Sequence, residues 1–336
     1  MNKLHIAVIS GGVSAEHDVS LKSGELAARN LDPARFTHTP IVIEKDGQWR
    51  LGGAAPCSIF EAISRLPDLG IDCAFLALHG PYGEDGRIQG LLDLLGIPYT
   101  GSPCAASALG MDKVRSKALL AHHGVAVAPD VLVDVRRWRK QPSDVQADIV
   151  QQLGYPCVVK SPCEGSSLGM GIPQGPGELS SVLDHVFTFG ETALVEGYVE
   201  GTELTCGVLE TEPGKPPLAL PVTEIRPVSA RYFDFQAKYT PGATEEITPA
   251  PIPDAIREKT QSLAVRAHEL IGCRGFSRSD MIVRDGEPVW IEINTIPGLT
   301  DTSLFPQAAE AAGFPYADMA AKLIEAALAR AQRKDV

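Results

Sequence analysis

The chain begins with an apolar run that leads through a glycine-rich turn into a helical stretch. Residues 4–9 form the run, and Gly11 and Gly12 form the turn. A strand, a glycine turn and a helix in this order open a βαβ unit, which restricts the chain to folds built on a largely parallel sheet. Two further apolar runs end in similar turns, so residues 1–105 are expected to form a small α/β domain.

Two loops at strand ends are candidates for ligand binding. The first turn lacks the spacing G-x-G-x-x-G, so it is not a dinucleotide fingerprint. Glu16 lies where the first helix begins, either as part of a binding site or as an acid stabilised by the helix dipole. The second loop, residues 79–86, is rich in Gly and Pro. It follows a strand, and open α/β sheets bind ligands at the carboxyl ends of their strands.

The overall composition excludes several classes of protein. A chain of 336 residues is too long for one ordinary core and indicates two or three domains. Its net charge of −12 disfavours nonspecific binding to nucleic acid or to an anionic membrane. No signal peptide or membrane span is expected, because the first apolar run is too short for either. Seven scattered cysteines without a C-x-x-C pair indicate free thiols, and a reducing cytoplasm is the expected compartment.

A third candidate site follows the apolar strand that ends at Lys160. The next residues, 161–171, form a loop rich in Gly and Ser that lacks the Walker spacing G-x-x-x-x-G-K-[ST]. Free N–H groups beside a lysine suit a flap over phosphates, whereas the alternative is a plain connection. A long irregular segment, 222–248, is either a lid or a disordered insert, and its aromatic residues favour a lid.

Residues 292–304 begin as a strand and continue as a Pro-Gly loop. Successive strand side chains alternate faces, so Glu292 and Asn294 project together. Two oxygen donors followed by free backbone N–H groups suit a magnesium ion with phosphate. The alternative is a solvated edge strand without function.

Several short motifs stand in order along nearly the whole chain. They are Gly11-Gly12-x-Ser14-Ala15-Glu16-x-x-Val19-Ser20, His79-Gly80-x-x-Gly83-Glu84-Asp85-Gly86, Tyr99-Thr100-Gly101-Ser102, Met111-Asp112-Lys113, Glu164-Gly165-Ser166-Ser167-x-Gly169, Lys238-Tyr239, Arg278-x-Asp280 and Glu292-x-Asn294-Thr295-x-Pro297-Gly298-x-Thr300-x-x-Ser303-Leu304. In this combination the chain resembles the D-alanine–D-alanine ligases of the ATP-grasp carboxylate–amine ligase superfamily. The resemblance implies a Rossmann-like (pre-ATP-grasp) N-terminal domain, residues 1–105, and a two-lobed ATP-grasp fold with a central lobe, 106–192, and a C-terminal lobe, 193–336.

The resemblance implies an enzyme that activates a carboxylate with ATP. A carboxylate is a poor electrophile, so such a ligase first forms an acyl phosphate, from which the amine of a second amino acid displaces phosphate. Phosphoryl transfer depends on positioning and charge neutralisation. The implied ligands of two Mg²⁺ (or Mn²⁺) ions are Asp280, Glu292 and Asn294. The implied ATP-binding residues are Lys113, Lys160 and Lys238 at the phosphates, Glu196 at the adenine edge and Glu203 at the ribose.

The resemblance also implies how the first amino acid binds. Glu16 would anchor its ammonium group, and Ser166 and Tyr239 would complete a hydrogen-bonded trio that holds the lid. His79 would lie close to the same substrate. Relatives that esterify D-lactate lack the tyrosine at this lid position, so Lys238-Tyr239 favours D-alanyl-D-alanine as the product, for peptidoglycan precursor synthesis.

The same resemblance assigns the other half of the reaction. Arg278 and the N–H of Gly298 would face the tetrahedral oxyanion, and Ser303 with the N–H of Leu304 would bind the second carboxylate. The implied partners are D-alanine and ATP, without nucleic acid or membrane, in a homodimer formed through the N-terminal domain. Two alternatives are a ligase that uses D-Ser or D-lactate second and a non-catalytic nucleotide-binding regulator. The intact acidic residues, Arg278 and the lysines argue against the regulator.

The hairpin around residues 284–287 should bring two acidic residues together. For Asp280 and Glu292 to share a face, the loop must contain an odd number of residues. The dipeptide Asp285-Gly286 alone favours a two-residue turn, which would separate the carboxylates. We therefore predict a loop of three or five residues, with Gly286 in a left-handed bulge conformation.

Overall fold

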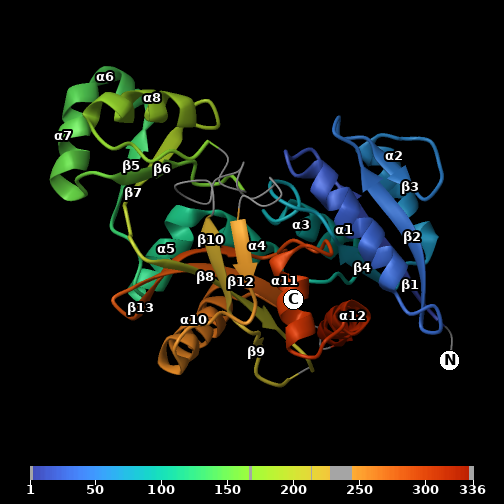
Figure 1. Ribbon diagram of the computed structural model, residues 1–336. Helices are drawn as coiled ribbons and strands as arrows, with labels where there is room; N and C mark the ends of the chain where they lie inside the picture. Colours follow the sequence, from blue (N-terminus) through green and yellow to red (C-terminus); the bar gives the residue numbers. More distant parts are fainter. Residues whose placement is uncertain (1–2, 166–168, 213, 228–243, 333–336) are drawn as a thin grey trace.

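The described part of the chain folds around three β-sheets, each with its own helices (Figure 1). The structure is a computed structural model that describes residues 3–165, 169–212, 214–227 and 244–332. Within these ranges no helix is long and apolar enough to cross a membrane.

The N-terminal domain has a sheet in the order β3-β2-β1-β4. Its strands are β1 (Leu4–Gly11), β2 (Phe36–Ile43), β3 (Trp49–Leu51) and β4 (Cys73–Leu76). Its helical segments are α1 (His17–Asn30), α2 (Ile59–Arg65), η1 (Leu66–Leu69) and α3 (Arg87–Leu95). The next helix, α4 (Cys104–Met111), buries Ala106 in a cluster with Trp290 and Ile293 of the C-terminal lobe. β1 is parallel to β2 and β4, as the strand–turn–helix order predicts, and only the edge strand β3 is antiparallel.

The central lobe has a small antiparallel sheet in the order β5-β7-β6. The strands are β5 (Asp130–Asp134), β6 (Cys157–Lys160) and β7 (Thr192–Gly197), and the helices are α6 (Val135–Lys140), α7 (Pro142–Gln152) and α8 (Pro176–Val186). The lobe has its own core, to which Trp138 and Leu183 contribute. Because β7 pairs with both other strands, the sheet extends to Gly197, past the boundary expected between residues 192 and 193.

The C-terminal lobe has the largest sheet, in the order β11-β10-β8-β12-β13 with β9 beside β8. Its strands are β8 (Thr202–Leu209), β9 (Leu218–Ala219), β10 (Thr223–Pro227), β11 (Thr244–Ile247), β12 (Phe276–Arg284) and β13 (Glu287–Asn294). Its helices are α10 (Asp254–Ile271), α11 (Leu304–Ala311) and α12 (Tyr316–Gln332). α5 (Lys113–His122) packs against α10 and β13 of this lobe, and Asp112 caps it by accepting from the N–H of Arg115.

The N-terminal domain and the C-terminal lobe share one hydrophobic core. Phe305 and Leu323 of the lobe belong to the same buried cluster as Ile6 and Phe75 of the domain. α12 packs against α1 and β4 of the N-terminal domain. Arg330 on α12 donates to the carbonyl oxygens of Tyr99 and Gly101 in the segment after α3. These two parts therefore form one packed body, whereas the central lobe, at the upper left of Figure 1, has a separate core.

The turn between β12 and β13 differs from our prediction. Arg284 pairs with Glu287, so Asp285 and Gly286 form a two-residue turn instead of a loop of three or five residues. Both turn residues are left-handed, with φ of 54° and 78°. This is the hairpin turn that the dipeptide itself favours, because its backbone twist matches that of the strands.

A β-bulge in β13 nevertheless brings the two carboxylates together. Met281 pairs with Trp290, whereas Asp280 pairs with Glu292, so Ile291 is an extra residue on β13. One extra residue changes the side-chain alternation by one position, which has the same effect as an odd-length loop. The predicted loop length was wrong, but the prediction that Asp280 and Glu292 lie together is confirmed.

Candidate active site

A cavity of about 570 Å³ lies between the central and C-terminal lobes. Six of the residues expected to bind ATP or metal line it: Lys113, Lys160, Glu196, Glu203, Asp280 and Glu292. They come from α5 and from strands of both sheets, β6 and β7 on one side and β8, β12 and β13 on the other. Lys238 lies outside the described residues. The cavity also has apolar walls, including Ile172, Val199 and Met281, which suit a flat heterocyclic base.

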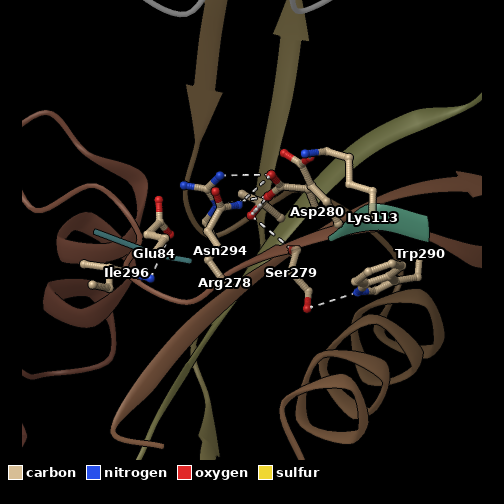
Figure 2. Close-up of polar contacts among 10 residues, drawn as sticks. Glu84, Lys113, Arg278, Ser279, Asp280, Trp290, Asn294 and Ile296 are labelled. Atoms are coloured by element: carbon tan, nitrogen blue, oxygen red, sulfur yellow. Dashed lines mark hydrogen bonds and ion pairs between the residues drawn. The ribbon is translucent and has the colours of Figure 1, made fainter. Parts of the chain in front are cut away.

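Asp280 is at the centre of a polar cluster at one end of this cavity (Figure 2). Arg278 donates to both of its carboxylate oxygens, from Nε and Nη2, at 2.9 Å each. Thr205 donates to the same carboxylate at 2.6 Å, and the amide of Asn294 lies 3.3 Å from it. Burial opposes the charge of Arg278, but the nearby Asp280 and Glu292 outweigh burial and raise the pKa of the guanidinium.

The chemistry of this cluster fits magnesium. Asp280 and Glu292 supply carboxylate oxygens and Asn294 an amide oxygen, the ligands that Mg²⁺ prefers. Among the described residues no group of three or more His, Cys, Asp or Glu side chains could hold a metal. A set with only two carboxylates suits an ion that completes its shell with water and substrate phosphates. Lys113 Nζ lies 3.2 Å from Glu292, so positive charge already neighbours these acids.

Glu196 is buried at the other side of the cavity between two lysines. Lys160 Nζ lies 2.6 Å from one carboxylate oxygen, and Lys117 pairs with the other. Burial opposes the charge of Glu196, but the two lysines outweigh burial and lower its pKa. We did not predict Lys117 from the sequence. Its spacing of four residues from Lys113 on one helix was the available signal, since such positions share a face.

The carboxylate of Glu16 lies where three loops converge. A Cβ atom on Gly80 would be 2.7 Å from Glu16 Oε2, and one on Gly165 would be 2.8 Å from it. The carboxylate therefore touches both the loop after β4 and the start of the Gly/Ser loop after β6. The expected partners Ser166 and Tyr239 lie outside the described residues.

His79 and Glu84 connect the N-terminal domain to the loop after β13. His79 Nε2 is 2.9 Å from Ser23 Oγ, and its Nδ1 is 3.2 Å from the carbonyl oxygen of Ile296. Glu84 accepts from the N–H groups of Gly80 and Ile296, both at 2.9 Å. Burial lowers the pKa of His79 and raises the pKa of Glu84 to about 8. Glu84 belongs to a quoted motif, but its bridging position was not predicted.

The loop between β13 and α11 brings Gly298 against Ser303. A Cβ atom on Gly298 would lie 2.7 Å from Ser303 Oγ, so a side chain does not fit there. Ser303 is the N-cap of α11, and its hydroxyl accepts from the N–H of Thr300 at 3.0 Å. Leu304 is the first residue of α11. The first N–H groups of a helix lack intrahelical partners and attract carboxylates.

Comparisons with known proteins identify the family. The family model described as the D-ala D-ala ligase N-terminus matches residues 5–102, and the one described as the C-terminus matches residues 119–325. The D-alanine–D-alanine ligase of Desulforudis audaxviator is 41% identical over 326 residues, which is 97% of this chain and 99% of that protein.

Solved structures agree with these matches. The D-alanine–D-alanine ligase from Bacillus anthracis complexed with ATP has a TM-score of 0.81 and 31% identity, covering 98% of this chain and 99% of that one. VanG D-Ala:D-Ser ligase from Enterococcus faecalis has a TM-score of 0.84 and 31% identity, covering 96% and 99%. The expected fold, a Rossmann-like domain followed by two ATP-grasp lobes, is confirmed. The chain therefore belongs to the D-alanine–D-alanine ligase family.

Proposed function

We propose that the cavity and the loops beside it join two D-alanine molecules into D-alanyl-D-alanine. The protein is an ATP-dependent ligase of peptidoglycan synthesis, and ATP with Mg²⁺ is its cosubstrate. One observation carries the assignment of the site. Asp280 and Glu292 are paired across β12 and β13 and line a cavity together with two lysines, and Arg278 donates to Asp280 beside this cavity. The loop after β13 contacts His79.

The reaction has two displacement steps. The carboxylate of the first D-alanine attacks the γ-phosphorus of ATP, the bond to the β-phosphate oxygen breaks, and ADP leaves. The amine of the second D-alanine then attacks the carbonyl carbon of the acyl phosphate and loses a proton. The carbon–oxygen bond to phosphate breaks, and phosphate leaves. Both steps move negative charge, so the site must supply fixed positive charge and hydrogen-bond donors.

The cavity has these groups for the nucleotide. Lys113 and Lys160 would neutralise its phosphates, with Lys238 of the lid segment at the γ-phosphate. Asp280, Glu292 and Asn294 would hold Mg²⁺, which would supply positive charge that offsets the charge of the phosphates. Glu196 and Glu203 would bind the adenine edge and the ribose hydroxyls.

The loops beside the cavity have groups for the amino acids. Glu16 would bind the ammonium group of the first D-alanine, with His79 beside it and with Ser166 and Tyr239 holding the lid. Arg278 and the Gly298 N–H would stabilise the oxyanion, where one donor lowers the barrier by about 3 kcal/mol. The hydroxyl of Ser303 and the Leu304 N–H at the start of α11 would bind the second carboxylate.

A phosphate-release assay tests the proposal. The protein is mixed with ATP and Mg²⁺ and then with D-alanine, D-serine, D-lactate or L-alanine, and the products are identified by mass. We expect phosphate release with D-alanine alone, D-alanyl-D-alanine as the product and loss of both in Glu16→Gln. Because VanG, a structural relative, is a D-Ala:D-Ser ligase, a mixed dipeptide in the D-alanine plus D-serine reaction would contradict our substrate assignment. No release with any amino acid would favour the regulator.

The proposed assembly is a cytoplasmic homodimer formed through the N-terminal domain. All seven cysteines are free, as a reducing compartment requires. Phe60 on α2 is 81% exposed and its neighbour Ile59 is 41% exposed, an apolar surface that a partner subunit would cover. Light scattering should give twice the chain mass for the wild type and a smaller mass for Phe60→Asp. A wild-type monomer at all concentrations would contradict the dimer.

A further inference from the structure

Lys117 is a buried lysine next to the nucleotide cavity that the proposed reaction leaves without a role. Its side chain is only 2% exposed. Nζ pairs with Glu196, which lines the cavity, and lies 2.7 Å from Asp130 Oδ2. Buried lysines are rare unless they are paired, because removing an ammonium group from water is costly. The pairs with Asp130 and Glu196 therefore offset the cost of burying the ammonium group of Lys117.

The strand register explains why a cation is needed here. Asp130 on β5 is directly opposite Glu196 on β7 in an antiparallel pair. Side chains of such a pair lie on the same face, and like charges directly opposite one another are destabilising. Lys117 enters from α5 and pairs with both carboxylates. Lys160 binds the second oxygen of Glu196, so the four side chains form a charge-balanced set.

We propose that Lys117 is a positioning residue for the nucleobase, because it fixes Glu196 as an ionised acceptor that selects an exocyclic amino group. An ionised carboxylate only accepts hydrogen bonds. Adenine presents an amino donor at its 6 position, whereas hypoxanthine presents a carbonyl oxygen that would face the carboxylate with like partial charge. A site built to bind one hydrogen-bonding group discriminates strongly against an analogue that lacks it.

Lys117 suits this role better than Lys160. In the proposed function Lys160 also contacts phosphate, so its ammonium group is shared between Glu196 and the nucleotide. Lys117 has no such second task, because its other partner is Asp130 of the protein. The inference rests on the proposed placement of adenine beside Glu196.

The test compares ATP with ITP, which differs in the group at position 6 of the base. The variants are Lys117→Met, Glu196→Gln and their combination. The matched control is Arg115→Met on the same helix, which removes the pair that the exposed Arg115 side chain makes with Asp112. The KM values for ATP, ITP and D-alanine are measured with kcat at saturating Mg²⁺.

We expect Lys117→Met and Glu196→Gln each to raise the KM for ATP by about tenfold, the effect of losing one hydrogen bond to a charged group. The preference for ATP over ITP should shrink by a similar factor, while kcat and the KM for D-alanine stay near wild type. The double variant should resemble Glu196→Gln, because residues that act through one another are not additive. Arg115→Met should match the wild type throughout.

Two results would overturn the inference in distinguishable ways. If Glu196→Gln loses the preference for ATP and Lys117→Met keeps it, Lys117 has only a structural role and the placement of adenine stands. If Glu196→Gln keeps the preference, the placement of adenine is wrong and the inference fails with it. Should Lys117→Met not fold, Lys117→Met/Asp130→Asn removes the repulsion between the facing carboxylates and gives the same comparison.

Discussion

Glu84 is a buried carboxyl group that accepts from two backbone N–H groups, one in its own loop and one at Ile296. Burial raises its pKa from 4.5 to about 8. The folded protein therefore keeps a proton that the unfolded chain releases between these two pH values. The contribution of Glu84 to the free energy of unfolding should therefore be largest below pH 4.5. It should decrease as the pH rises toward 8, by at most about 1.4 kcal/mol per pH unit.

Glu84→Gln should remove this dependence, because its amide does not titrate. The variant loses one acceptor, so it is expected to be less stable than the wild type at pH 5, with the difference shrinking as the pH rises to 8. Urea unfolding of both proteins across this range, without nucleotide or metal, measures the difference. Two stability curves that run parallel from pH 5 to 8 would show that Glu84 does not titrate there.

Asp280 contacts Arg278 and Asn294, to which the proposed function gives roles in oxyanion stabilisation and metal binding. Asp280→Asn keeps the size of the side chain but removes its charge, so Mg²⁺ should bind less tightly and Arg278 should lose its counter-ion. We expect kcat to fall at least about 100-fold, the loss typical of one electrostatic contact in a transition state. The control is Ser279→Ala, since Ser279 faces Trp290 on the other side of β12 (Figure 2). Phosphate release that stays at the wild-type rate in Asp280→Asn would exclude Asp280 from the metal site.

At the scale of elements, the turn between β12 and β13 shows that the local dipeptide Asp285-Gly286 determines the type of turn. Gly286 has a φ of 78° and open space around its Cα, so any cost of a side chain there comes from the backbone. Gly286→Ala should lower the free energy of unfolding by about 1 kcal/mol. Gly53→Ala is the control, since Gly53 also has open space but lies outside the left-handed region. Urea unfolding should show a loss for Gly286→Ala alone, and equal effects would indicate that the turn relaxes without cost.

Elements with local start and stop signals could be predicted from the sequence. Two helices carry such signals: Gly96 ends α3 in a left-handed conformation, and Arg330 lies in the last turn of α12. Asp280 and Glu292 also lie on one face of the hairpin as expected, although a bulge in β13 and not an odd-length loop brings them together.

The hairpin register could not be predicted, because an odd loop and a bulge restore the alternation equally well. The wider sheet decides between them. β12 pairs with β8 from Phe276 to Val283 without a break, so the irregularity lies in β13. β13 is the edge strand of the sheet, where bulges are common. The role of Lys117 could not be predicted for a similar reason. Its two partners, Asp130 and Glu196, come together only when β5 and β7 pair.

At the scale of the whole molecule, the three tryptophans report on the three parts of the chain. Trp49 is in the N-terminal domain, Trp138 in the central lobe and Trp290 in the C-terminal lobe, and all are buried. Since the N-terminal domain and the C-terminal lobe share a core, Trp49 and Trp290 should lose their folded signals together. Trp138 belongs to a separate core and should have its own midpoint.

Fluorine NMR of protein labelled with 5-fluorotryptophan follows all three positions in one thermal titration. Arg330 donates to the carbonyl oxygens of Tyr99 at 2.8 Å and Gly101 at 3.0 Å, which ties α12 to the N-terminal domain. Arg330→Met should destabilise this shared body by about 1.5–3 kcal/mol, the range for hydrogen bonds to a charged group. The midpoints of Trp49 and Trp290 should then fall together while that of Trp138 stays unchanged. A fall at Trp49 alone would mean that the N-terminal domain unfolds independently, and a common fall at all three would mean that the central lobe belongs to the same cooperative unit.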